Sequence, residues 1–271
     1  MPELPEVETT RRGIEPFLAG RSIQKLVVRQ PALRWPVTPE LARRAINSRI
    51  LNISRRGKYL LVRTETGTLI IHLGMSGSLR CLDSAPPPGK HDHIDMRLDN
   101  GTLLRYTDPR RFGAWLWTED DPLKHPLLRD LGPEPLATTF DGSTLVRAAQ
   151  RRRLAVKSFL MDSHTVVGVG NIYANEALFM AAIHPQRSAG RIGASRYDRL
   201  AEAVKSVLTD AIRQGGTTLR DFSGGDGKPG YFRQSLHVYG RTGQPCPSCA
   251  APICEKRVGQ RSSFYCKSCQ R

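Results

Sequence analysis

The sequence predicts an α+β protein, in which a β-sandwich domain with an N-terminal helix precedes a helical domain that ends in a β-hairpin zinc finger. Three observations support this fold class. Short strand-like runs separated by turn residues fill much of residues 23–106. The apolar period becomes helical over residues 143–214. Two Cys-x2-Cys pairs close the chain at the spacing of a zinc site.

The composition predicts a folded protein with a polyanionic partner. Its 271 residues favour two domains, because single cores seldom grow beyond about 250 residues. Lys and Arg number 41 against 25 Asp and Glu, a net charge of +16. Nucleic acid is the leading partner and a membrane surface is the alternative. Because no apolar run reaches about 18 residues and no signal segment precedes Pro2, we expect a cytoplasmic protein that does not enter a membrane.

The first residues form a candidate reactive terminus. Removal of Met1 leaves Pro2 with a free secondary amine, whose pKa of about 8 keeps it partly unprotonated near neutral pH. Such an amine attacks electrophilic carbon, and Glu3 lies beside it for proton transfer. Apolar residues recur at helical spacing over residues 2–18, which predicts a helix that ties the terminus down. The alternative is that the terminus is disordered and chemically idle, as most are.

Strands dominate the rest of the first domain. Short strand-like runs between turn residues predict strands over Ile23–Arg29, Ile50–Ser54, Tyr59–Arg63, Leu69–Leu73, His93–Leu98 and Leu103–Tyr106. A short helix over Pro39–Ile46 interrupts them, and Asn100-Gly101 predicts a hairpin turn. Residues 86–89, Pro-Pro-Pro-Gly, predict a loop. Short strands of this kind fit either a β-sandwich or a barrel.

A stretch with two prolines and a glycine, Leu131–Leu136, ends the first domain. The predicted division is a first domain at 1–131, a linker at 132–141, a helical domain at 142–236 and a zinc finger at 237–271. Helical spacing predicts helices over Ser143–Gln150, Leu154–Met161, Ile172–Met180 and Ser195–Gln214. Residues 216–233 are rich in Gly and polar residues and predict a long functional loop. Two Gly-rich stretches fail the dinucleotide and Walker patterns, because Tyr173 and Pro229 occupy key positions.

The C-terminal cysteines predict one structural zinc ion. The pattern Cys-x2-Cys-x16-Cys-x2-Cys is formed by Cys246, Cys249, Cys266 and Cys269. Four thiolates make a closed tetrahedral shell without an open position for a substrate. Two disulfides are the alternative, but they require an oxidising compartment. Cys81 and Cys254 are left over as buried or idle thiols, although Cys254 lies between the pairs and competes as a ligand.

Six separated motifs follow one another along the chain: Pro2–Thr9, Arg56–Tyr59, His72–Gly77, Asp108–Gly113, Gly168–Tyr173 and the cysteine pairs. In these motifs and their order the whole chain resembles the bacterial formamidopyrimidine-DNA glycosylase family. The resemblance implies a β-sandwich, a helix-two-turn-helix unit and a zinc hairpin, with DNA held between the domains. It further implies a monomer that excises oxidised purines, chiefly 8-oxoguanine and formamidopyrimidines, from double-stranded damaged DNA. Excision is followed by β- and δ-elimination at the abasic site.

The resemblance also implies catalytic roles. Pro2 becomes the Schiff-base nucleophile, Glu3 the acid that assists sugar ring opening, and Lys58 a proton-transfer group in β-elimination. Arg261 on the zinc hairpin becomes the cation that binds flanking phosphates and aids δ-elimination. Asn171, at the turn before a helix, resembles a phosphate clamp. Without its motif neighbours, Lys58 is simply a surface lysine at a glycine turn.

A base inside a duplex must be flipped out before Pro2 reaches it, and other side chains must fill the hole. Phe112 wedged between base pairs, Met75 filling space and Arg110 bonded to the widowed cytosine match that task. Apart from the resemblance, Met and Phe are more often core residues. The remaining DNA-contact candidates are His72, His91, Arg153, Tyr173, Lys228 and Tyr239.

Two other functions stay open: an endonuclease VIII-like glycosylase for oxidised pyrimidines, and a non-enzymatic zinc-finger DNA-binding protein. The loop over Gly225–Phe232 and the Pro-Glu-Leu-Pro-Glu opening favour the purine-lesion enzyme over the first. Borohydride trapping separates the non-enzymatic DNA-binding protein from both enzymes, since only an amine nucleophile forms a covalent adduct. Ala250 stands where the family commonly has glycine, and we expect it to strain its turn because glycine accepts a positive φ more readily.

Overall fold

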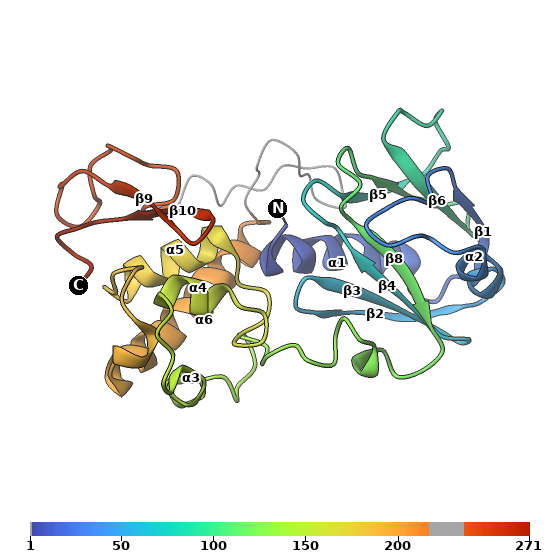
Figure 1. Ribbon diagram of the computed structural model, residues 1–271. Coiled ribbons are helices and arrows are strands. Elements are labelled where there is room, and N and C mark those ends of the chain that lie inside the picture. The colour runs from blue at the N-terminus through green and yellow to red at the C-terminus, as the bar shows by residue number, and fades with distance from the viewer. Residues whose placement is uncertain (1, 217–235) are drawn as a thin grey trace. The chain divides into compact units, whose positions relative to one another are not determined.

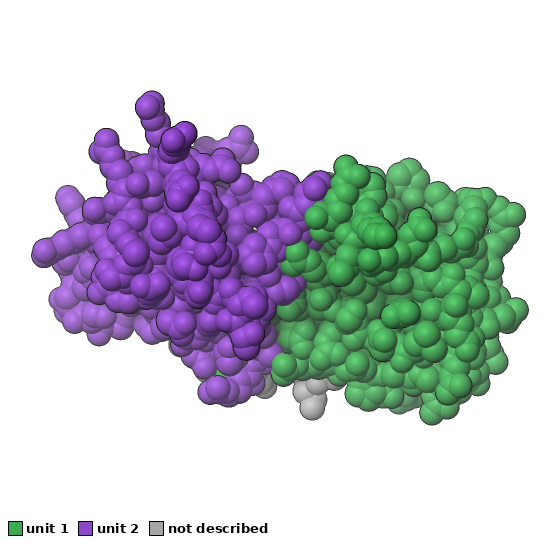
Figure 2. Space-filling view, turned by 90° about the horizontal axis from the view of Figure 1, so that it is seen from below, with its two compact units in different colours: residues 1–129, 214–233 green, residues 130–213, 234–271 purple. Residues whose placement is uncertain are grey.

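The computed structural model describes residues 2–216 and 236–271 (Figure 1). This part of the chain divides into two compact units, which Figure 2 shows in different colours. The first unit holds residues 2–129 together with 214–216, and the second holds residues 130–213 and 236–271. Among these residues, no helix is both long and apolar enough to cross a membrane.

The first unit opens with helix α1, Leu4–Leu18. Glu3 is its N-cap, and the Glu6 carboxylate accepts the backbone N–H of Glu3 at 2.8 Å, as in a capping box. Leu4 and Ile14 are 0% exposed, because the apolar stripe of the helix packs into the core of the unit. The predicted helix is confirmed, and it holds the start of the chain against folded protein.

After α1, the described part of the first unit is organised around two four-stranded antiparallel sheets. One sheet has the order β1 (Ile23–Val28), β6 (Asp92–Leu98), β7 (Leu103–Thr107) and β5 (Ser78–Leu82). The other has the order β2 (Ile50–Arg56), β3 (Tyr59–Thr64), β4 (Thr68–His72) and β8 (Ala114–Thr118). Ile94 and Met96 of the first sheet share one core with Leu60 and Trp115 of the second, so the arrangement is a sandwich and not a barrel.

All six predicted strands and the short helix, α2 (Pro39–Ala45), are present. Strands β5 and β8 were not predicted from the sequence. Strand β5 buries a single apolar side chain, Leu79, so its local pattern is weak. Pairing with β7 and with β4, rather than local pattern, makes these segments strands.

The described part of the second unit holds four α-helices: α3 (Gly142–Ala149), α4 (Val156–Met161), α5 (Asn171–Met180) and α6 (Ala194–Arg213). Asp141 caps α3, because its carboxylate accepts the N–H of Thr144 at 2.8 Å. The predicted apolar face of α6 is buried, with Leu200, Val204 and Leu208 at 0% exposure. Helix α5 is buried from Ile172 to Phe179, which makes it the centre of the unit.

The chain ends in a hairpin of β9 (Cys254–Val258) and β10 (Arg261–Tyr265), joined at Gly259 with a φ of 60°. The hairpin packs on α5, since Phe264 and Ile253 share a small core with Phe179. The helices and the predicted zinc finger therefore form one compact unit.

Candidate functional site

Pro2 and Glu3 are both buried at the head of α1, and Glu3 is 2% exposed. The capping geometry fixes the direction in which the chain enters the helix. A terminus held in this way differs from the disordered, idle terminus that was the alternative. Its amine, once free, and its carboxylate are adjacent along a fixed backbone.

Lys58 lies in the two-residue turn between β2 and β3, where Gly57 has a φ of 57°. Arg55 ties this hairpin to α1, because its guanidinium bonds to the Glu8 carboxylate at 3.2 Å and to the Gly57 carbonyl at 2.9 Å. Burial raises the pKa of Glu8, but hydrogen bonds from Arg11 and Arg12 outweigh it and leave the pKa below its usual value. Glu8 and Arg55 were missed in the sequence, where they look like ordinary surface charges.

His72 lies at the end of β4, opposite Tyr59 across the strand pair, with the ring centroids 4.7 Å apart. Burial, followed by the positive charges of Lys58 and Arg34, lowers the pKa of His72 to about 4. The ring is thus neutral near pH 7, and its Nδ1 accepts the N–H of Gly74 at 3.0 Å. The side chain holds the turn that follows β4 and lies close to the Lys58 charge.

The three predicted hole-filling residues come from two turns of the first unit. Met75 lies in the turn after β4 and is partly buried. Arg110 and Phe112 lie between β7 and β8, and the Arg110 guanidinium carbon is 5.0 Å from the centre of the Phe112 ring. Phe112 is 42% exposed, so it is not the core residue that the alternative reading required.

In the second unit, Asn171 is the first residue of α5, and Gly170 before it has no capping side chain. The Asn171 Oδ1 atom is buried and accepts no hydrogen bond from the residues that the structure describes. Asn175, one turn later, donates to the Asn171 carbonyl at 2.5 Å and accepts the N–H of Phe264 at 2.8 Å. A single buried amide thus joins the start of α5 to β10.

Arg261 is exposed at the first position of β10. The next two residues are held by Lys157 of α4, whose ammonium donates to the Ser262 carbonyl at 2.6 Å and to the Ser263 hydroxyl at 2.7 Å. Lys157 is 1% exposed and lies 106 positions from Ser263, so no local pattern in the sequence signals this contact.

Glu176 of α5 holds the segment in which the described chain resumes. Its carboxylate, 0% exposed, accepts the backbone N–H groups of His237, Val238 and Tyr239 at 2.8, 3.0 and 2.8 Å. The same carboxylate bonds to the His237 ring and raises the pKa of that histidine. Tyr239 is partly buried, with its ring 5.0 Å from that of Phe264.

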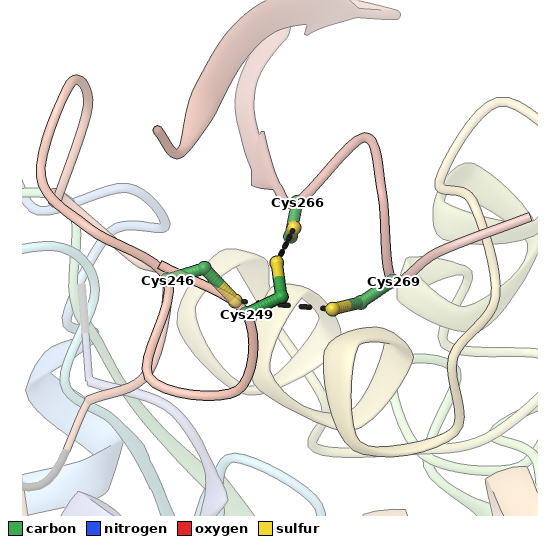
Figure 3. Close-up of side chains that lie close together, drawn as sticks. All are labelled: Cys246, Cys249, Cys266 and Cys269. Carbon is green, nitrogen blue, oxygen red and sulfur yellow. Dashed lines mark hydrogen bonds between the residues drawn. The ribbon is translucent and has the colours of Figure 1, made fainter. Parts of the chain in front are cut away.

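The four predicted zinc ligands converge (Figure 3), and their sulfur atoms all lie within 4.8 Å of one another. Cys246 and Cys269 are separated by 4.0 Å and Cys249 and Cys266 by 3.4 Å, sulfur to sulfur. A tetrahedral zinc ion with bonds of about 2.3 Å separates its sulfurs by about 3.8 Å, so this set fits the ion. Cys254 lies outside the cluster, and Ala250 has the expected positive φ, 60°.

The other candidates differ in exposure. His91 is partly buried and Arg153 is exposed. Tyr173 is 0% exposed within α5. Lys228, and most of the loop predicted over 216–233, lie outside the described residues.

A β-sandwich with a buried reactive terminus, joined to a helical unit that carries a four-cysteine finger, defines a DNA repair glycosylase of the helix-two-turn-helix class. The family model for the formamidopyrimidine-DNA glycosylase N-terminal domain matches residues 1–115, and that for its H2TH domain matches residues 131–223. The chain belongs to the formamidopyrimidine-DNA glycosylase family, whose members are base-excision repair glycosylases with AP lyase activity.

Individual relatives agree over the full length. The formamidopyrimidine-DNA glycosylase of Stutzerimonas stutzeri is 59% identical over 271 residues, with all of both chains covered. The crystal structure of MutM (Fpg) from Thermus thermophilus has a TM-score of 0.89 at 40% identity, covering 99% of this chain and 98% of that one. Lactococcus lactis Fpg in complex with an N7-benzyl-Fapy-dG containing DNA has a TM-score of 0.92 at 34% identity, with both chains fully covered.

The lowered pKa of His72 predicts a pH-dependent stability of the first unit. In the unfolded chain His72 binds a proton below about pH 6.5, whereas in the folded unit it does so only below about pH 4. The free energy of unfolding should therefore decrease as the pH is lowered from about 6.5 to about 4, by up to about 3 kcal/mol. His72→Asn, which keeps an acceptor for Gly74, should remove this part of the pH dependence. Urea unfolding followed by tryptophan fluorescence reports on this unit alone, because Trp35, Trp115 and Trp117 all belong to it. If the free energy of unfolding depends on pH equally steeply in the unaltered protein and in His72→Asn between pH 6.5 and 4, the assignment to His72 is contradicted.

Proposed function

We propose that this chain excises 8-oxoguanine and formamidopyrimidines from double-stranded DNA and then cleaves the abasic site by β,δ-elimination. The observation that carries the proposal is the buried Pro2-Glu3 terminus, fixed at the head of α1. A relative that binds a Fapy-dG analogue in DNA supports the choice of substrate. Because the substrate is genomic DNA, the proposed place of action is the bacterial cytoplasm.

Pro2 is the proposed nucleophile. Its amine nitrogen attacks C1′ of the damaged nucleotide, the glycosidic bond breaks, and the base leaves with the proton that the amine loses. Glu3 then protonates the sugar ring oxygen, the C1′–O4′ bond breaks, and the ring-opened iminium forms. The cationic iminium acidifies the adjacent C2′–H, and removal of that proton expels the 3′ phosphate. Lys58, on the hairpin that Arg55 ties to α1, is the proposed proton-transfer group for this step.

The remaining candidates are proposed to hold the DNA. Asn171, Arg261 and Tyr239 all depend on α5 for their position, and we assign them to backbone phosphates together with His91 and Arg153. Met75, Arg110 and Phe112 are assigned to the hole that the flipped nucleotide leaves. One structural zinc ion in the four-cysteine site is proposed to hold the fold of the finger.

Retention of Met1 tests the nucleophile, because it converts the Pro2 amine into an amide without a reactive lone pair. Borohydride trapping on an abasic duplex should fall by on the order of 100-fold or more. Affinity for the same duplex, measured without borohydride, serves as the control and should stay largely intact. Full trapping with Met1 retained would exclude Pro2, and trapping by neither protein would leave only the DNA-binding alternative.

Cys249→Ser tests the metal. This variant should lose stoichiometric zinc and bind duplex DNA weakly, because the small core of the finger includes two of the ligand cysteines. Tryptophan fluorescence should be unchanged, since no tryptophan lies in the second unit. Cys254→Ser is the matched control and should retain zinc, because that thiol lies outside the cluster. Normal DNA binding by a zinc-free Cys249→Ser protein would refute the structural role.

Arg261→Ala tests the phosphate contact of the hairpin. The variant should retain zinc, bind DNA more weakly, and lose about one unit from the slope of log affinity against log salt. Arg257→Ala on the neighbouring strand removes the same charge from the same hairpin and should change the slope less. Equal effects of the two substitutions would assign the contribution to the general charge of the hairpin and not to Arg261.

A further inference from the structure

One buried carboxylate joins the two turns that carry Met75, Arg110 and Phe112. Asp108 is 0% exposed. Its Oδ1 accepts the Ser76 hydroxyl at 2.8 Å, and it shares the Arg110 N–H with the Ser76 hydroxyl oxygen, each at 3.3 Å. Its Oδ2 accepts the Tyr106 hydroxyl and the Gly113 N–H, both at 2.9 Å. Four groups thus donate hydrogen bonds to the carboxylate. Two of them are backbone N–H groups, which can only donate.

The two turns also touch through their backbones. A Cβ added at Gly74, where φ is 65°, would lie 2.4 Å from the carbonyl carbon of Phe112. A Cβ at Gly113 would lie 1.8 Å from the Tyr106 hydroxyl and 2.7 Å from the His72 carbonyl. No side chain fits at either position, so the turns form one close-packed body. His93, bonded to the Asp108 carbonyl at 2.8 Å, holds this body from β6.

The outer side of this body presents a large aromatic ring and a cation to solvent. Phe112 is 42% exposed beneath the Arg110 guanidinium, and Arg111 between them has a positive φ of 56°. An arginine in the left-handed region costs free energy that the surrounding contacts must supply. The structure therefore supports, on a rigid buried base, an aromatic ring and a cation directed away from the core.

We infer that Asp108 is a positioning residue, whose carboxylate sets the two turns as one preformed wedge for the DNA stack. The inference rests on the proposed function of Met75, Arg110 and Phe112. Without the carboxylate, each turn must be ordered as the DNA binds, and that ordering opposes insertion. Asp108 itself touches no DNA and acts through the backbone positions of Arg110 and Gly113.

Asp108→Asn tests the inference. If Oδ2 becomes the NH2 group, it faces the Gly113 N–H, so a donor meets a donor. If Oδ1 does, it faces the Arg110 N–H, which then keeps only the Ser76 hydroxyl as an acceptor. The ratio of the trapping rate on duplex abasic DNA to that on a single-stranded abasic oligonucleotide should fall by about tenfold, the effect of one buried donor losing its acceptor. The ratio isolates the wedge, because a single strand has no stack to open. A 2-aminopurine beside the lesion should report slower unstacking, and preference for cytosine opposite the lesion should decline.

Two controls separate positioning from general destabilisation. Asp95→Asn alters another buried carboxylate of the same sheet, one that bonds to Arg105 and Arg29, and should leave the duplex-to-single-strand ratio near that of the unaltered protein. If Asp108→Asn does not fold by tryptophan fluorescence, the pair Ser76→Ala and Tyr106→Phe removes the two hydroxyl donors and should lower the ratio in the same direction.

A folded Asp108→Asn protein with an unchanged ratio and unchanged opposite-base preference would overturn the inference. An equal loss in Asp95→Asn would overturn it as well, since the effect would then be general. Failure of the proposed function looks different, because the unaltered protein would then show no trapping on any substrate. If Arg110→Ala loses opposite-base preference while Asp108→Asn keeps it, the wedge stands and only the role of Asp108 falls.

Discussion

Buried carboxylates that accept backbone N–H groups hold the functional segments of both units. Glu6 accepts from Glu3 at the reactive terminus, and Glu176 accepts from three successive residues, 237–239. Asp108 does the same for the turns of the first unit. Hydrogen bonds to a charged group contribute about 1.5–3 kcal/mol each, and they offset the cost of taking the carboxylate out of water. A backbone donor is fixed by the chain, so such a bond orders a loop more strictly than a pair of flexible side chains does.

Other acidic side chains form ion pairs with arginines inside the fold. Within the sandwich, Asp95 binds Arg105 and Arg29, and on α1 Glu8 binds Arg11 and Arg55. These acidic groups are thus engaged in internal ion pairs, in a chain whose net charge is +16. The unbalanced cations remain for a polyanion, and their effect falls as salt rises. Internal ion pairs at low exposure are screened much less, so the fold and the DNA contacts respond differently to ionic strength.

Much of the fold could be predicted from the sequence because its signals are local. The helical stripe of α1, the short apolar runs of β3 and β4, the apolar face of α6 and the cysteine spacing each lie within a short window. The residues that position the site could not be found in this way. Lys157 and Ser263 are 106 positions apart, and Glu176 and Tyr239 are 63 apart. Tyr173 is a different case, because the sequence motif that contains it gave no sign that its side chain is buried within α5.

Helix α5 gives the second unit its functional geometry. Asn171 begins it, Asn175 bonds to β10 beside the strand end that carries Arg261, and Glu176 fixes the segment of Tyr239. These three side chains occupy less than two turns of one helix, so the groups assigned to phosphate share a single rigid support. The cysteine cluster shapes the knuckles of the finger, whereas the amide and carboxylate of α5 place the hairpin on the unit. The cysteine cluster and α5 therefore have separate tasks: the cluster joins the two knuckles of the finger, and α5 sets where the hairpin arginine stands relative to the start of the helix.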